Sequence, residues 1–198
     1  MIQIDLTGKR ALICGASQGI GEATALMFAK AGASVVLLAR SEDKLAALVK
    51  KLEQLNPNQK HQFICLDLSS TAEIEIQISA LLKSGPIHIL VHNSGGPKGG
   101  ALIDALPEDF FQAFQNHIGS AQTLAKLLVP GMKTEKFGRI INVISTSVKV
   151  PIPNLGVSNT IRGAMASWAK TLANEVGSYG ITVNNILPGF TATPRLES

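Results

Sequence analysis

Short apolar runs alternate with longer amphipathic segments along the whole chain. The apolar runs, rich in valine, isoleucine and leucine, predict six strands, at residues 10–14, 34–38, 62–66, 87–91, 139–144 and 181–187. Apolar residues recur at helical spacing in the segments between and beyond these runs. They predict five helices, at residues 19–31, 43–55, 71–83, 107–128 and 159–176. Strands and helices therefore alternate from one end of the chain to the other.

The predicted strands are continuously apolar rather than alternately apolar and polar, which indicates burial on both faces. Strands of this kind are typical of a parallel sheet that is covered by helices on both sides. The alternation therefore predicts an α/β fold with a doubly wound parallel sheet, the three-layer α/β/α arrangement called the Rossmann fold. No internal repeat, low-complexity tract or linker divides the sequence, so residues 1–198 are interpreted as a single domain.

Net charge and cysteine usage exclude several function classes. The formal net charge is +4, but the basic residues are scattered, with no lysine- or arginine-rich run and little aromatic interleaving, so we expect no nucleic-acid partner. Cys14 and Cys65 lie in short apolar runs and are interpreted as reduced core thiols, without the spacing of metal ligands. No apolar stretch is long enough for a membrane span, and the first residues do not resemble a signal peptide. We expect a cytoplasmic protein with no metal and no membrane partner.

A glycine-rich turn follows the first predicted strand. It reads Gly15-Ala16-Ser17-Gln18-Gly19-Ile20-Gly21, and the first predicted helix opens within it. Glycines at such a junction let the backbone approach a pyrophosphate, whose charge meets the free N–H groups of the helix N-terminus. A tight turn also needs glycine for steric reasons alone. Its place after the first of six strands favours dinucleotide binding.

The glycine turn and several later motifs resemble the short-chain dehydrogenase/reductase family. The turn is similar to that family's T-G-x-x-x-G-I-G fingerprint, with Cys14 where threonine is usual. His92-Asn93-Ser94-Gly95 stands where the family has N-N-A-G, and Pro188-Gly189 matches the P-G pair after strand six. The resemblance extends over essentially the whole chain, and overall it is nearest to the 3-oxoacyl-carrier-protein reductases.

The resemblance implies a set of residues around a dinucleotide cofactor and a carbonyl or alcohol substrate. The implied cofactor-binding residues are Gly15, Ser17, Gln18, Gly19, Ile20, Gly21, Arg40, Ser41, Asp67, Leu68, Asn93, Ser94, Gly95, Arg162, Pro188, Gly189 and Thr191. Asp67 corresponds to the residue that contacts the adenine ring. The implied catalytic positions are Asn116, Ser145, Ser158 and Arg162.

The end of the second strand bears on the choice of cofactor. An acidic side chain there would bond the ribose 2′-hydroxyl of NAD, whereas arginine accommodates the 2′-phosphate of NADP. The sequence has Ala39-Arg40-Ser41 and no carboxylate at that position, which favours NADP(H). A solvent-facing arginine at a strand end is the alternative interpretation. Gln18 weakens the case slightly, since many NADP-dependent relatives carry a second basic residue there.

The catalytic centre departs from the family pattern. The family uses a tyrosine as acid/base, its pKa lowered by a lysine four residues later, together with a serine and an asparagine. Ser145 and Asn116 match the last two, but Ser158 and Arg162 stand in place of the tyrosine and the lysine. An aliphatic hydroxyl is a weaker acid than a phenol, and arginine cannot give up its proton. Tyr179, the only tyrosine, fits no justifiable register.

Two functions remain open at this stage. The first is an oxidoreductase that transfers a hydride between NADP(H) and a small carbonyl or alcohol substrate, with Ser158 or a water supplying the proton. The second is a non-catalytic NADP(H)-binding sensor or interaction protein on the same fold. We also expect a homo-oligomer. The sequence ends at Ser198, short of the family's C-terminal segment, so strand six would form an exposed edge unless the chain is part of a longer protein or something else covers that edge.

Overall fold

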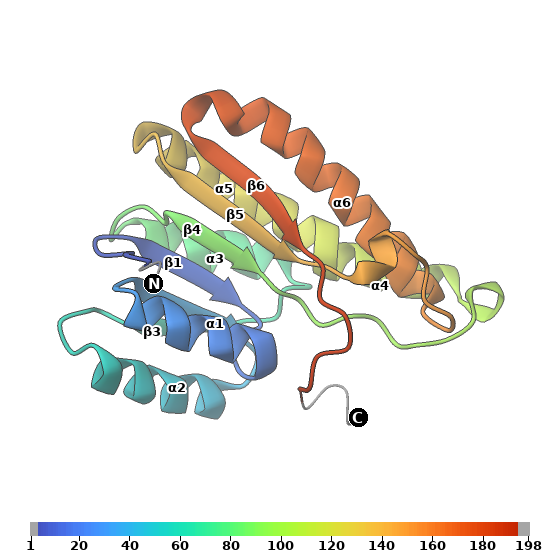
Figure 1. Ribbon diagram of the computed structural model, residues 1–198, viewed down its shortest axis with the longest axis horizontal. Helices are drawn as coiled ribbons and strands as arrows, with labels where there is room; N and C mark the ends of the chain where they lie inside the picture. The colour runs from blue at the N-terminus through green and yellow to red at the C-terminus, as the bar shows by residue number, and fades with distance from the viewer. Residues whose placement is uncertain (1–3, 194–198) are drawn as a thin grey trace.

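One parallel sheet organises the molecule. The computed structural model describes residues 4–193 and contains a six-stranded sheet in the order β3-β2-β1-β4-β5-β6, with every neighbouring pair parallel (Figure 1). The strands are β1 (Arg10–Cys14), β2 (Ser34–Ala39), β3 (Gln62–Cys65), β4 (Ile89–His92), β5 (Gly138–Val143) and β6 (Ile181–Ile186). The strand order reverses between β1 and β4, which in doubly wound sheets opens a crevice at the carboxyl ends of the strands. The predicted fold class is confirmed.

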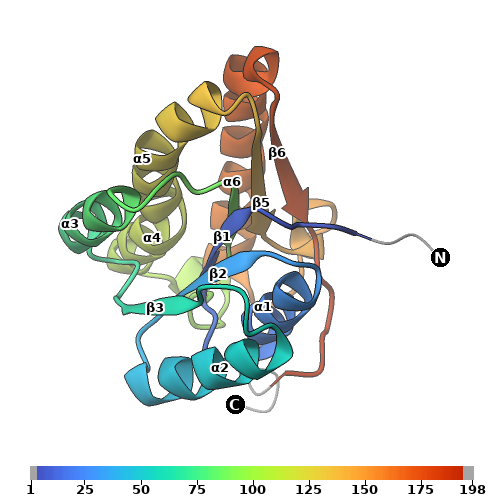
Figure 2. The same cartoon turned by 90° about the vertical axis from the view of Figure 1, so that its left-hand side faces the viewer.

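Helices cover both faces of the sheet, in separate groups. The α-helices are α1 (Gly19–Lys30), α2 (Glu42–Leu55), α3 (Thr71–Leu82), α4 (Pro107–Phe114), α5 (Ser120–Thr134) and α6 (Gly156–Val176). One buried apolar cluster joins one face of the sheet to α3, α5 and α6, and a second joins the opposite face to α1 and α2. Figure 2 shows these two groups on opposite sides of the sheet. Three layers result, as the sequence predicts.

The alternation of side chains along β1 explains why both faces are buried there. Leu12 points into the cluster with α5, and Ile13 points into the cluster with α1, and both are fully buried. Burial on both faces does not extend to the sheet edges. In β6 the side chains of Thr182, Asn184 and Ile186 are exposed, because α1 and α2 cover the other half of that face. The expectation that all six strands are buried on both faces is therefore wrong for the two edge strands, β3 and β6.

Cys65 corrects a second expectation. Cys14 is a buried thiol in β1, as the sequence indicates, whereas Cys65 at the end of β3 is exposed. β3 is an edge strand with only β2 beside it, so its apolar pattern does not lead to full burial.

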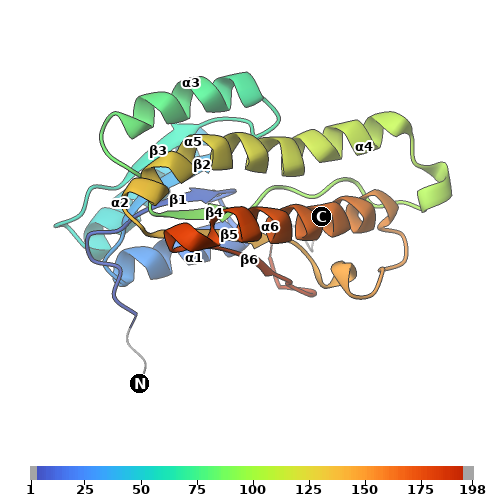
Figure 3. The same cartoon turned by 90° about the horizontal axis from the view of Figure 1, so that it is seen from above.

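The long helical region after β4 is not one uniform helix. A π-helical segment, Gln115–Gly119, joins α4 to α5, and α5 continues through Pro130 to Thr134 rather than ending near residue 128. Proline removes one helical hydrogen bond, but Leu128 and Met132 on either side of it are buried against the sheet and hold the last turn in place. Figure 3 shows α4 and the first turns of α6 projecting beyond the strands.

Candidate cofactor and active site

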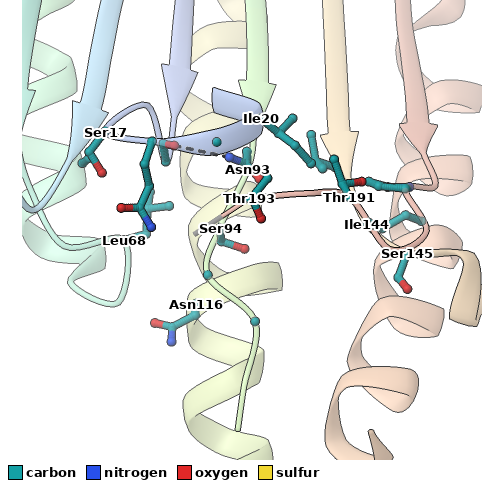
Figure 4. A pocket seen from close by; sticks show the side chains of 18 of the residues that line it. Ser17, Ile20, Leu68, Asn93, Ser94, Asn116, Ile144, Ser145, Thr191 and Thr193 are labelled. Carbon is teal, nitrogen blue, oxygen red and sulfur yellow. Dashed lines mark hydrogen bonds between the residues drawn. The ribbon is translucent and has the colours of Figure 1, made fainter. Parts of the chain in front are cut away.

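A cavity of about 1020 Å³ lies at the carboxyl ends of the strands, where the strand order reverses. Its walls come from the segments that follow all six strands, from the starts of α1 and α2, from the π-helical segment and from α6. All residues that the family resemblance assigns to cofactor or catalysis line this cavity, with the exception of Gly21. Segments far apart in the chain thus meet in one place, and Figure 4 shows several of their side chains around it.

The glycine turn forms one wall of the cavity. Gly15 and Gly19 both have a φ of 60°, a left-handed conformation that side chains disfavour. A Cβ at Gly15 would overlap the carbonyl oxygen of Asn93, so the turn packs directly on the segment after β4. The Nδ2 group of Asn93 donates a hydrogen bond to Gly15 O at 3.4 Å, drawn in Figure 4. The turn is therefore held by close backbone packing and by a hydrogen bond from the Asn93 side chain.

Gly21, the third glycine of the turn, does not line the cavity but is needed for packing. A Cβ there would overlap the carbonyl oxygen of Gly15 well inside van der Waals contact. Only glycine lets α1 approach the turn so closely. The side chain of Gln18, which precedes α1, makes no capping hydrogen bond with it. Amide groups at the start of a helix that no side chain caps are suited to bind a pyrophosphate.

Basic groups gather at the end of the cavity next to β2. The Nη1 atom of Arg40 lies 3.8 Å from Asp67 Oδ2, and the Arg40 side chain is 81% exposed. Lys44, in the first turn of α2, places its Nζ atom 2.9 Å from Gln18 Oε1 and also lines the cavity. Sequence reasoning missed Lys44. The only available signal was its position four residues after Arg40, at the predicted start of a helix.

Ser145, Ser158 and Asn116 line the other end of the cavity. Ser145 follows β5, and its Oγ accepts a hydrogen bond from the backbone N–H of Ser147 at 3.1 Å. The hydroxyl proton of Ser145 therefore remains available to donate a hydrogen bond. Asn116 lies in the π-helical segment, with its Oδ1 accepting a hydrogen bond from Gln112 Nε2 at 3.3 Å. π-Helical segments are frequent at functional sites, because the wider turn moves one side chain out of α-helical register.

Arg162 is buried beside these serines. Its side chain is 6% exposed, and its Nη1 atom donates a hydrogen bond to the carbonyl oxygen of Val143 at 2.7 Å. α6 begins at Gly156, earlier than predicted, so that Ser158 lies in its first turn and Arg162 one turn later. Both line the cavity. The expected contact of Arg162 with ribose hydroxyls stays a prediction.

A buried polar layer supports this end of the cavity from behind. His92 Nε2 and Ser120 Oγ share a hydrogen bond at 2.9 Å, and Ser120 Oγ donates to the carbonyl oxygen of Asn116 at 2.7 Å. Burial, and then the positive charge of Arg162, lower the pKa of His92 from 6.5 to about 4, so this imidazole is neutral near pH 7. A further hydrogen bond joins Ser94 Oγ and His117 Nδ1. The layer fixes the backbone on which Asn116 sits.

Tyr179 lies outside the cavity. It belongs to a short 3-10 turn before β6, and the ammonium group of Lys133 lies 4.2 Å from the centre of its ring. It cannot replace the missing tyrosine, as the sequence analysis concludes. Within residues 4–193 no cluster of histidine, cysteine, aspartate and glutamate side chains is arranged to hold a metal ion.

Comparisons with known proteins agree with this geometry. The profile of the family described as short chain dehydrogenase matches residues 9–198. A dehydrogenase/reductase SDR family protein 7-like from Anopheles gambiae is 37% identical over 193 residues, which are 95% of this chain and 61% of that relative. A 3-oxoacyl-acyl-carrier-protein reductase from Haemophilus influenzae is 33% identical over 195 residues, 97% of this chain and 78% of the relative. The chain therefore spans less than two thirds of the first relative and more of the second.

Solved structures show the same similarity. The crystal structure of L-sorbose reductase from Gluconobacter frateurii, complexed with NADPH and L-sorbose, superposes with a TM-score of 0.93 at 32% identity. The superposition covers 98% of this chain and 74% of that one. A common sheet topology thus accompanies the common sequence motifs.

Proposed function

Because the chain belongs to the short chain dehydrogenase family, a family of NAD(P)-dependent oxidoreductases, we propose that it transfers a hydride between NADP(H) and a small carbonyl or alcohol substrate. A 3-oxoacyl thioester is the substrate class that the similarity to 3-oxoacyl-acyl-carrier-protein reductases favours. The single observation that carries the proposal is the shared cavity. It brings the glycine turn together with Ser145 and Asn116, which are far apart in the chain.

The residues at the nucleotide end fit a dinucleotide phosphate. The glycine turn offers backbone amides with no space for side chains, and Asp67 and Leu68 lie beside it for the adenine ring. No carboxylate follows β2 at the position that binds a ribose 2′-hydroxyl, whereas Arg40 and Ser41 line the cavity there. This arrangement supports NADP(H) over NAD(H). The L-sorbose reductase with which this chain superposes was crystallised with NADPH.

The residues at the other end orient the substrate and move a proton. When bound, the nicotinamide ring supplies or accepts the hydride. The Oγ of Ser145 accepts a hydrogen bond from Ser147 N–H, and its hydroxyl proton donates a hydrogen bond to the substrate oxygen. Ser158, or a water beside it, exchanges the proton with that oxygen. Arg162 stabilises negative charge that develops there through its fixed positive charge.

A non-catalytic NADP(H)-binding protein is the second candidate. The observation that favours it is the absence of the tyrosine and lysine pair, because Ser158 is a poor acid and Arg162 is bonded to Val143 O. The same cofactor end would serve such a protein without any acid/base pair. Turnover therefore decides between the two candidates.

The test measures NADPH binding and turnover with a panel of ketones, ketoses and 3-oxoacyl thioesters. We expect slow but measurable turnover in the native protein, and a loss of about hundredfold in Ser145→Ala with NADPH binding retained. The double variant Ser158→Tyr/Arg162→Lys should raise turnover, provided that its melting temperature shows it is folded. Tight NADPH binding without turnover on any substrate would support the second candidate.

We also propose a cytoplasmic homo-oligomer. Large apolar side chains are exposed around α4, with Ile103 at 91% and Phe111 at 72%, and such a patch is suited to pack against a second copy. Sedimentation of the native protein and of Phe111→Glu tests this surface. No helix in residues 4–193 has the length and apolarity needed to cross a membrane.

A further inference from the structure

Lys44 is a cavity residue that neither the family motifs nor the proposed reaction uses. It lies in the first turn of α2, at the same end of the cavity as Arg40 and Ser41. Its ammonium group reaches across to the glycine turn, where Gln18 Oε1 accepts a hydrogen bond from it at 2.9 Å. Two elements that flank the nucleotide end are thus joined by one cation.

The contact with Gln18 leaves the charge of Lys44 available. An amide oxygen is neutral, so it orients the ammonium group without cancelling its charge, and two of the three N–H donors remain for a ligand. The two ion pairs found within residues 4–193 are Arg40 with Asp67 and Lys51 with Glu22, and neither involves Lys44. Many NADP-dependent relatives carry a basic residue at the position of Gln18, so this glutamine counts against NADP(H) in the sequence. In the structure Gln18 instead holds the ammonium group of Lys44 at that place.

Arg40 alone is a weak site for a phosphate dianion. Its side chain is highly exposed and lies beside Asp67, whose negative charge offsets part of the attraction. Single exposed ion pairs contribute little, whereas converging charges hold a phosphate, which carries nearly two negative charges at neutral pH. A second cation at the same end of the cavity, held against the glycine turn, changes this balance. The hydroxyl of Ser41 is also available, because it makes no capping hydrogen bond to α2.

We propose that Lys44 and Arg40 bind the 2′-phosphate of NADP(H) from two sides, and that Lys44 sets the preference for NADP(H) over NAD(H). The inference rests on the proposed NADP(H)-dependent function and names a second residue, besides Arg40, that determines its cofactor specificity. Gln18 acts as a positioning residue that orients the ammonium group over the glycine turn. Ser41 supplies a hydroxyl to the same phosphate.

The test compares ligands that differ only in the 2′-phosphate. Bound NADPH is displaced by 2′,5′-ADP or by 5′-AMP, and the change in NADPH fluorescence gives the affinity of each competitor. The difference measures the contribution of the 2′-phosphate without any turnover. Direct titration with NADPH and NADH repeats the comparison on whole cofactors. In Lys44→Met we expect affinity for NADPH and 2′,5′-ADP to fall about tenfold, with NADH and 5′-AMP unchanged. Lys44→Arg, which keeps the charge, should retain most of the preference.

Lys51→Met is the matched control. Lys51 lies on the same helix two turns further along, on the same face, and pairs with Glu22 outside the cavity. The Lys51→Met variant removes the same charge from α2. A general electrostatic effect would therefore lower the affinity for NADPH in both variants, and that outcome would overturn the proposal. An unchanged ratio of NADPH to NADH affinity in Lys44→Met would overturn it too. A native protein that does not distinguish 2′,5′-ADP from 5′-AMP would instead contradict the NADP(H) assignment itself.

Discussion

The two ends of the cavity differ in the kind of contact that stabilises them. At the nucleotide end, glycine backbone packs on glycine backbone, and the core behind it is aliphatic, with Ala25 and Val35 fully buried. At the catalytic end, buried polar groups lie directly behind the lining residues, among them His92 and Arg162. One end therefore depends on close packing of the backbone, and the other on hydrogen bonds between buried polar groups.

This difference explains which end departs from the family pattern. A turn that admits no Cβ tolerates almost no substitution, so the nucleotide end keeps the glycines of the fingerprint. A polar layer can accept a new member if each group finds a partner. Arg162, which stands where the family has lysine, donates a hydrogen bond to Val143 O. The comparison teaches that cofactor binding and catalysis can vary separately on this fold.

The largest effect should come from adding one methyl group at the nucleotide end. In Gly21→Ala the new Cβ must push Gly15 away, which we expect to cost about 3 kcal/mol of stability and to weaken NADPH binding about a hundredfold. Thermal unfolding and NADPH titration measure both.

The matched control is Gly163→Ala, the same substitution in α6. Nothing lies within 4 Å of a Cβ at Gly163, so this variant should gain roughly 0.5–1 kcal/mol from the helix preference of alanine. Equal behaviour of the two variants would remove close backbone packing as the basis of the nucleotide end.

A smaller loss should follow from acid, and it should arise at the catalytic end. The pKa of His92 is about 4 in the folded protein against 6.5 ordinarily, so between these pH values the unfolded chain binds a proton that the folded chain does not. Stability should therefore fall as the pH drops below 6.5, by about 2.5 kcal/mol from this group between pH 7.5 and pH 4.5. Urea unfolding of the protein at pH 7.5 and pH 4.5 measures the loss.

His92→Asn separates this group from the other histidines. Burial also lowers the pKa of His61 and His88, which adds acid sensitivity of the same sign. The variant should lose some stability at pH 7.5 but show a flatter decline toward pH 4.5, whereas His61→Asn should flatten it less. If His92→Asn declined as steeply as the native protein, the polar layer would not be the acid-sensitive part of the molecule.

The smallest effect on the fold should come from Arg40→Ala. The exposed pair with Asp67 contributes at most about 1 kcal/mol, so the melting temperature should hardly change. Affinity for NADPH should nevertheless fall about tenfold, with NADH binding unaltered. Equal losses for both cofactors would show that Arg40 acts on the fold or the adenine rather than on the 2′-phosphate.

The sequence was a sound guide to whatever depends on local pattern. Five predicted helices and six strands match within a few residues, apart from the π-helical segment within the fourth helical region and the extension of α5 past Pro130. The glycine turn follows from the local pattern after the first strand, whereas Ser145 and Ser158 were assigned through the family resemblance, and both serines line the cavity. The exposure of Cys65 and of β6 did not follow, because burial at a sheet edge depends on which helices cover it.

What the sequence determined by itself is thus the order of the elements and the fold class, both of which depend on apolar periodicity. The resemblance to a known family added many of the residues that line the cavity, though not Lys44. Tertiary structure alone decided the partners of individual side chains. Lys44 meets Gln18 across 26 positions, Arg162 meets Val143 across 19, and His92 meets Ser120 across 28. Such pairs arise only when strands and helices pack, because no local pattern specifies which distant atom a long polar side chain will reach.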